Sequence, residues 1–181
     1  MSPEEEAVGM VASLMALAAR TAPKGKGVDE IDIHVARGNE ISLLAKEMEK
    51  IGNEKNIGFF IRDSGNVAAS DACVIIGIRG QVPAGINCGG CGYPDCAALT
   101  KVFDSAPLKG YFTGPNCVIR MADIGIAVGS AAKTASIHNA DNRIMYSAGV
   151  SALSLGWCPG CTVAYGIPLK ASGKCIYFDR K

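Results

Sequence analysis

The sequence is poor in the residue patterns that mark several common functions. It has two histidines among 181 residues, and neither His34 nor His138 has a partner at metal-ligand spacing. No P-loop, Ser/His/Asp set or paired-carboxylate signature is present. The net charge is +1, and no basic stripe with interleaved aromatic residues occurs, so we expect no nucleic-acid partner. No uninterrupted apolar run of about 18 residues occurs either, so we expect no membrane span.

The composition predicts one folded domain over residues 1–181. Hydrophobic residues make up 49% of the chain and charged residues 19%, which is typical of a globular protein. The N-terminal residues 1–6 are acidic, where a signal peptide would be basic, so we expect a cytoplasmic protein. In that reducing compartment, the eight cysteines are expected to be metal ligands or thiols rather than disulfides.

Hydrophobic periodicity and capping residues predict alternating helices and strands. A capping box of Ser2 and Glu5 begins a helix that runs to about Arg20. Further helices are expected from the cap Asn39 to near Gly52, from residue 97, over 121–138, and from the cap Asp141 to near Gly156. Strands are expected at 31–35, 73–78, 161–166 and 175–178. This interleaving indicates an α/β or α+β domain, with residues 80–118 as an insert.

The insert carries four cysteines, three of them in the pattern C-x2-C-x4-C. These are Cys88, Cys91 and Cys96, and Cys117 follows after a gap of 20 residues. Thiolates at such spacing select zinc, Cu(I) or an iron–sulfur cluster. The surrounding glycines allow the backbone to wrap closely around a large group, which favours a [4Fe–4S] cluster over tetrahedral zinc. A structural zinc site and four free thiols are the alternatives.

A second cysteine pair, Cys158-Pro-Gly-Cys161, has three interpretations. It is a redox-active dithiol, a pair of metal ligands, or a structural turn with two buried thiols. Cys73 and Cys175 both read as small buried hydrophobic residues.

Residues Cys88–Cys96 resemble the short [4Fe–4S] module of electron-transfer subunits in anaerobic redox complexes. In that module, C-x2-C-G-x3-C is followed by a fourth cysteine downstream, which implies that Cys88, Cys91, Cys96 and Cys117 are the ligands. The gap before Cys117 is longer than the usual one. Over its whole length the chain resembles a family of uncharacterised proteins that contain a ferredoxin domain.

Other segments resemble nitroreductase-like flavoproteins. Residues 15–25 are similar to the helix-to-loop opening of those proteins, and residues 123–127 and 149–157 resemble their central helices and the loop along the flavin. Residues 165–168 resemble a late strand with the pattern G-x-P. The resemblance implies an α+β fold of the FMN-dependent nitroreductase type, an α/β sandwich in which the cysteine-rich segment is an insert. It also implies a homodimer with FMN at the subunit interface.

The arginine-rich segment that holds the FMN phosphate in nitroreductases is absent from this sequence. Candidate replacements are Arg20, with Lys24 and Lys26 in the following Pro/Gly loop, and Arg180 at the C-terminus. The alternative is that these are solvated surface charges.

The sequence therefore supports two hypotheses. In the first, the protein is a redox enzyme whose [4Fe–4S] cluster passes electrons to a flavin, which reduces a small molecule. In the second, it is a non-catalytic ferredoxin-like carrier that serves a redox partner protein, or a metal sensor.

Overall fold

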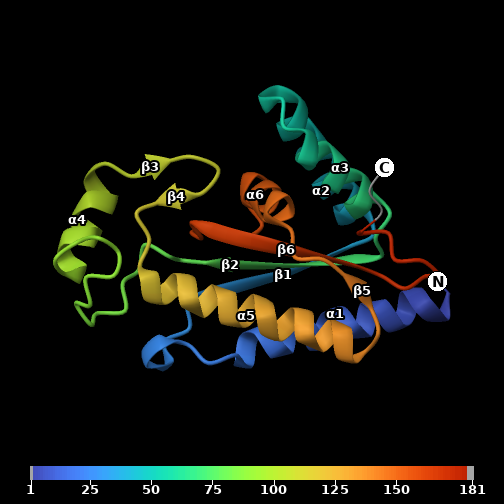
Figure 1. Ribbon diagram of the computed structural model, residues 1–181, viewed down its shortest axis with the longest axis horizontal. Coiled ribbons are helices and arrows are strands. Elements are labelled where there is room, and N and C mark those ends of the chain that lie inside the picture. Colours follow the sequence, from blue (N-terminus) through green and yellow to red (C-terminus); the bar gives the residue numbers. More distant parts are fainter. Residues whose placement is uncertain (1, 179–181) are drawn as a thin grey trace.

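The computed structural model describes residues 2–178, which are built around a four-stranded antiparallel sheet (Figure 1). The strand order is β1-β2-β6-β5, and the strands are β1 (Ile31–Arg37), β2 (Ala72–Ile78), β6 (Val163–Lys170) and β5 (Asp141–Asn142). All seven residues of β2 are buried, because the strand lies between β1 and β6 and is covered on both faces. The expected central strand at 73–78 is confirmed.

One face of the sheet is covered by α1 (Pro3–Thr21) and α5 (Val118–Ile137), which pack side by side (Figure 1). Side chains alternate along β2, so Val74, Ile76 and Ile78 belong to the core on this side. Small residues of α5, such as Ala127 and Ala131, are fully buried there. They allow the two helices to lie close together.

The opposite face carries α2 (Asn39–Lys55), α3 (Gly58–Ala68) and α6 (Tyr146–Ser154) (Figure 1). Cys73 and Ile75 of β2 point into this second core. Gly149 of α6 faces the backbone of β6 so closely that a Cβ placed on it would lie 1.9 Å from the carbonyl oxygen of Ala164. The molecule is thus a three-layer sandwich with one apolar core on each side of the sheet.

The N-terminal ends of α1 and α2 differ in whether the predicted capping residue caps the helix. In α1, the Ser2 hydroxyl accepts a hydrogen bond from the backbone of Glu5, and the Glu5 carboxylate accepts one from Ser2, so the predicted capping box is confirmed. Asn39 is the first residue of α2 rather than its cap, because Gly38 precedes the helix with φ at +54°. That helix also continues through Gly52, which lies against α3.

Two further expectations about secondary structure were wrong, and one helix was missed. Asp141 does not cap a helix: it pairs with Lys170 in the β5–β6 ladder, and α6 begins five residues later. Residues 175–178 are not a strand, because Tyr177 instead turns inward and its hydroxyl forms a 2.8 Å hydrogen bond with that of Ser70. Helix α3 was not predicted, since its first residue is a glycine and no side chain caps it.

The segment 80–118 projects at one end of the sheet, beside the start of α5 (Figure 1). It begins with a long loop between β2 and α4 (Cys96–Ser105). The hairpin of β3 (Leu108–Lys109) and β4 (Thr113–Gly114) follows α4. Within residues 2–178, no helix is long and apolar enough to cross a membrane.

Candidate redox site

The backbone of the loop that carries Cys88 and Cys91 is bent by residues in left-handed conformations. Gly89 and Gly92 have φ values of +68° and +86°, a region that glycine enters without steric cost. Asn87 also has a positive φ, and its side-chain oxygen accepts a 3.0 Å hydrogen bond from the backbone N–H of Cys96. This bond ties the third cysteine of the motif to the residue before the first.

Helix α4 begins at Cys96 itself. Asp95 caps the helix by accepting a 2.8 Å hydrogen bond from the backbone N–H of Ala98. The Cys96 thiol is therefore placed in the first turn of a helix, where the helix dipole favours negative charge.

The fourth cysteine lies beside this loop despite its distance in the sequence. Cys117 is buried, directly precedes α5, and donates a 2.8 Å backbone hydrogen bond to the carbonyl of Gly80. It forms a small apolar cluster with Ala84 and Leu99, and Cys91 packs against that cluster. The chain thus brings Cys117 and Cys91 to the same small core.

Cys88 lies near the same helix start. Its sulfur is 3.7 Å from the point that a Cβ on Gly90 would occupy, and the same point is 2.7 Å from a methyl group of Val118, the first residue of α5. The four cysteines are free thiols in this structure, with Cys88 exposed. Their donor chemistry suits a soft metal. Across residues 2–178, however, no three His, Cys, Asp or Glu side chains are gathered closely enough to hold a metal ion.

A buried ion pair fastens the base of this segment to the sandwich. Arg120 and Asp123, on α5, are 2% and 3% exposed, and their side chains form a 3.0 Å ion pair. The Arg120 guanidinium also donates to the carbonyls of Val82 and Val28, and Asp123 accepts a 2.7 Å hydrogen bond from the N–H of Gly25. One pair of charges therefore joins the start of the cysteine-rich segment to the loop between α1 and β1.

The sequence interpretation missed this pair. The available signal was an Arg and an Asp three residues apart on the apolar face of a helix, a position where unpaired charges are rarely found.

The predicted FMN-phosphate residues are in different environments. Arg20 pairs with Asp29 at 2.6 Å and donates to the carbonyl of Ile31. The Lys24 ammonium donates to the last carbonyls of α1, those of Ala19 and Arg20, and is largely buried. The Lys24 side chain therefore completes the C-terminal end of α1, whereas that of Arg20 joins this helix to Asp29 and to the start of β1. Their assignment to a phosphate stays a prediction.

Lys26 lies beside the cysteine-rich segment. It is part of the short 3-10 turn η1 (Gly25–Gly27), and its ammonium nitrogen is 3.8 Å from the position of a Cβ on Gly85. Within the part of the chain that the structure describes, Lys26 forms no ion pair. Arg180 lies outside the described residues.

The second pair, Cys158 and Cys161, lies against β2 on the opposite side of the sheet from α5. Cys158 is buried and Cys161 half-buried. Burial raises the pKa of Cys158 to about 12 and that of Cys161 to about 11; the nearby Asp32 carboxylate further raises the pKa of Cys161, and the Arg79 guanidinium partly offsets this. The two thiols are consequently protonated at neutral pH.

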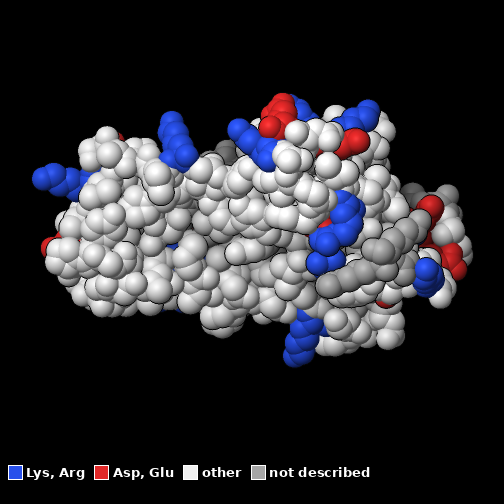
Figure 2. All heavy atoms as spheres, turned by 45° about the horizontal axis from the view of Figure 1, so that its top comes forward, with Lys and Arg blue, Asp and Glu red and all other residues white. Residues whose placement is uncertain are grey.

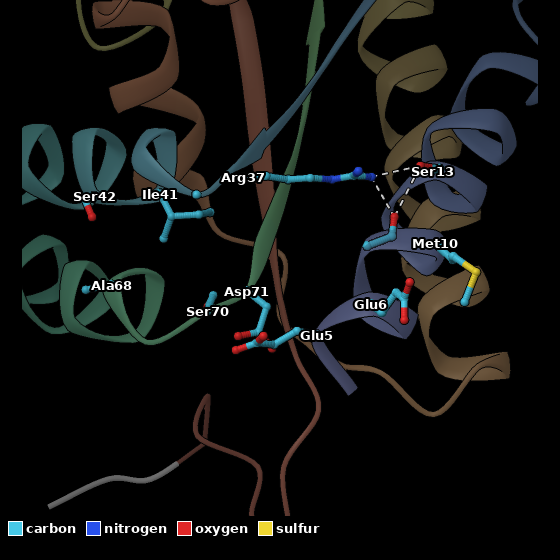
Figure 3. A pocket seen from close by; sticks show the side chains of 12 residues that line it. Glu5, Glu6, Met10, Ser13, Arg37, Ile41, Ser42, Ala68, Ser70 and Asp71 are labelled. Carbon is cyan, nitrogen blue, oxygen red and sulfur yellow. Dashed lines mark hydrogen bonds between the residues drawn. The ribbon is translucent and has the colours of Figure 1, made fainter. Parts of the chain in front are cut away.

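Two of the surface cavities differ in whether cysteines line them. One, of about 480 Å³, is lined by Cys158 and Cys161 together with Tyr111 of the hairpin and Lys55 of α2. The other, of about 640 Å³, lies between α1 and the start of α2, and no cysteine lines it (Figure 3). In that cavity, Arg37 donates to the carbonyl of Gly9 and to the hydroxyl of Ser13, as the dashed lines in Figure 3 show.

An aromatic cluster, also missed from the sequence, attaches the hairpin to the sandwich. Tyr146 is in contact with rings from the hairpin and from α3. The six rings of the cluster are those of Phe59, Phe60, Tyr111, Phe112, Tyr146 and Tyr165.

The surface over the hairpin and α4 is mostly uncharged, and no continuous basic stripe crosses the face drawn in Figure 2.

The arrangement of layers is that of the nitroreductase-like fold. A nitroreductase with bound FMN from Desulfitobacterium hafniense superposes with a TM-score of 0.54 over 96% of this chain and 81% of that chain, at 13% identity. A nitroreductase-like family protein from Bacillus cereus gives 0.55 over 95% and 79%, at 9% identity. A BluB-like flavoprotein from Clostridium difficile gives 0.52 over 95% and 84%, at 14% identity. At these identities the likeness shows the fold alone.

The chain belongs to a family of uncharacterised proteins that contain a ferredoxin domain (DUF2148), whose sequence profile matches residues 113–180. An uncharacterised protein from Archaeoglobus fulgidus is 43% identical over 180 residues, which cover 98% of this chain and 94% of that protein. The matched segment includes Cys117, Cys158 and Cys161. It begins at residue 113, after the three clustered cysteines Cys88, Cys91 and Cys96.

Proposed function

We propose that this protein is a redox protein that binds a [4Fe–4S] cluster through Cys88, Cys91, Cys96 and Cys117. In this proposal it transfers electrons to a small-molecule substrate or to a redox partner protein in anaerobic metabolism. The membership of a ferredoxin-domain family and the nitroreductase-like fold both support a redox role. When bound, the cluster would supply one-electron transfer.

The single observation that carries the proposal is the position of Cys117. A gap of 20 residues separates it from Cys96, yet the fold returns it to the apolar cluster against which Cys91 packs. Cys96 and Cys117 are also found at the N-terminal ends of α4 and α5. The partial positive charge of these ends would stabilise thiolates and the negative charge of a cluster.

FMN is the second cofactor that we propose. The structural neighbour from Desulfitobacterium holds FMN, and the fold of this chain is similar to it. Lys26 is our leading candidate for the phosphate, because its ammonium is uncommitted among the described residues, while the Arg20 guanidinium and the Lys24 ammonium are engaged. A Lys26→Ala substitution should therefore weaken FMN binding, whereas Lys101→Ala, on the exposed side of α4, should not.

We also propose that the protein is a homodimer in the cytoplasm. Met10, Leu14 and Leu17 of α1 are 62%, 41% and 58% exposed, and their spacing places them on one stripe of the helix. A second copy of the chain would cover this stripe. Light scattering of the wild-type protein and of Leu17→Glu tests this, since only the wild type should have twice the mass of the chain.

The cluster is tested by anaerobic purification followed by absorption spectroscopy and by iron and sulfide analysis. The wild-type protein should absorb broadly near roughly 400 nm, and Cys88→Ser, Cys96→Ser and Cys117→Ser should each lose most of that absorption. Cys175→Ser is the matched control, because this partly buried cysteine packs in the second core, away from the four. A bound flavin would add resolved bands near roughly 450 nm.

Two outcomes would contradict the proposal. A colourless protein that contains one zinc would assign the four cysteines to a structural metal. Cluster absorption that survives both Cys88→Ser and Cys96→Ser would show that the ligands lie elsewhere. If the cluster is confirmed, turnover of a nitroaromatic or quinone with a chemical reductant would distinguish an enzyme from a non-catalytic carrier.

A further inference from the structure

The Cys158–Cys161 pair has the backbone geometry of a disulfide-forming turn. The N–H of Cys161 donates a 3.1 Å hydrogen bond to the carbonyl of Cys158, so residues 158–161 form a tight turn, and Gly160 supplies the positive φ of +75° that the turn needs. The Cα atoms at the ends of such a turn are less than about 7 Å apart, which overlaps the range found across disulfides.

Gly77 of β2 leaves space beneath the two thiols. A Cβ built on Gly77 would lie 3.0 Å from the sulfur of Cys161 and 3.1 Å from that of Cys158. Both sulfurs therefore point at the same place on the strand and lie within about 6 Å of each other, so side-chain rotation can bring them to the roughly 2 Å of an S–S bond. Any larger residue at position 77 would fill the space in which they meet.

The two thiols differ in access. Cys158 is 3% exposed and belongs to the second core, whereas Cys161 is partly exposed. Both contribute to the cavity of about 480 Å³ in which Lys55, Tyr111 and Thr162 are also found. An incoming molecule would reach Cys161 first.

We propose that Cys158 and Cys161 are a disulfide-reducing dithiol, with Cys161 as the attacking thiol and Cys158 as the resolving thiol. The sulfur of Cys161, as thiolate, attacks a substrate disulfide R–S–S–R, forms a mixed disulfide and releases one R–S⁻. The sulfur of Cys158 then attacks that of Cys161, which closes the intramolecular disulfide and releases the second R–S⁻. Two electrons pass from the pair to the substrate, and the two thiol protons finish on the released thiols. This activity does not depend on the iron–sulfur cluster or on FMN.

The protonation of the pair makes it a slow reductant at neutral pH. Because burial raises the pKa of Cys161 to about 11 and that of Cys158 to about 12, the reduced state gains little from thiolate formation. The reaction of the pair with a small disulfide should therefore become faster as the pH rises toward 11, since only the thiolate attacks.

The test is the reaction of the purified, reduced full-length protein with glutathione disulfide, followed by tryptic digestion. Cleavage after Arg143 and Lys170 yields the peptide 144–170, in which Cys158 and Cys161 are the only cysteines. The wild-type peptide should lose two hydrogens, with two glutathione molecules released. Cys158→Ser should instead accumulate a glutathione adduct at Cys161, and Cys161→Ser should react at least about tenfold more slowly.

The Gly77→Ala variant supplies an independent measurement, because its Cβ would occupy the space between the sulfurs. It should slow closure of the disulfide and leave glutathione on Cys161. Gly65→Ala is the matched control, since a Cβ there meets nothing within 4 Å. A wild-type peptide that stays reduced, or an adduct on Cys158 in preference to Cys161, would overturn the proposal. Stoichiometric zinc bound by the pair and lost in both serine variants would also overturn it.

Discussion

Removal of the Asp123 carboxylate should be among the most destabilising single changes in this protein. The substitution Asp123→Ala leaves the Arg120 guanidinium 2% exposed with no counter-charge, and it removes the acceptor of the Gly25 N–H. Breaking a buried ion pair by deletion of one partner costs about 3–5 kcal/mol. In a domain of this size, each kcal/mol lowers the melting temperature by about 2–4 °C, so we expect a decrease of roughly 6–20 °C.

The assay is urea denaturation followed by circular dichroism, with Asp104→Ala as the control. Asp104 is an exposed residue of α4, so its loss should change the free energy of unfolding by less than about 0.5 kcal/mol. The double variant Arg120→Met/Asp123→Ala removes both charges and should be more stable than Asp123→Ala alone.

Two results would refute this reasoning. If Asp123→Ala lowers the free energy of unfolding by less than about 1 kcal/mol, water or a rearranged side chain satisfies Arg120, and the pair is not the buried link described above. If the effects of Arg120→Met and Asp123→Ala, each measured alone, add up to that of the double variant, the charges are not coupled.

Three further predictions concern other parts of the fold. Gly149→Ala should destabilise the protein by about 1–3 kcal/mol or more, because its Cβ would overlap the Ala164 carbonyl of β6. Gly129→Ala, at an exposed position of α5, should instead stabilise the protein by about 0.5–1 kcal/mol. Denaturation of both variants checks that the two effects have opposite signs. Alkylation of Cys161 by iodoacetamide should accelerate about tenfold per pH unit up to about pH 11, because only the thiolate reacts; a plateau near pH 9, measured by mass spectrometry, would show an ordinary thiol. Asp95→Ala should cost about 1 kcal/mol through loss of the α4 cap, measured by denaturation.

The parts of the fold that the sequence predicted are those specified by local interactions. Helix α1 was predicted because Ser2 and Glu5 form a capping box at its start, and β2 because the mostly apolar run 73–78 requires cover on both faces. Asp141 was misassigned because a capping residue and a short edge strand look alike locally; only the pairing with Lys170 of β6 decides between them. The strand expected at 175–178 was wrong because Tyr177 turns inward and its hydroxyl forms a hydrogen bond with that of Ser70.

The candidate sites were predictable to different degrees. The spacing of Cys88, Cys91 and Cys96 is readable in the sequence, and so is the turn at Cys158-Pro-Gly-Cys161. That Gly77 provides the space for the second pair was not predictable, because this contact joins residues about 80 positions apart. The same holds for the contact between Cys117 and the loop, which depends on how α5 docks on the sheet.

The buried Arg120 joins the loop between α1 and β1 to the start of the cysteine-rich segment through bonds that do not depend on the protonation or oxidation of nearby thiols. The groups that hold its guanidinium to these loops are the backbone carbonyls of Val28 and Val82, which neither titrate nor change oxidation state. Protonation or oxidation of cysteines only a few residues away therefore leaves these bonds intact. The distance between the loop of Lys26 and the start of the cysteine-rich segment therefore stays the same. A charge that appears on either of these two loops would act electrostatically on the other across an unchanged distance.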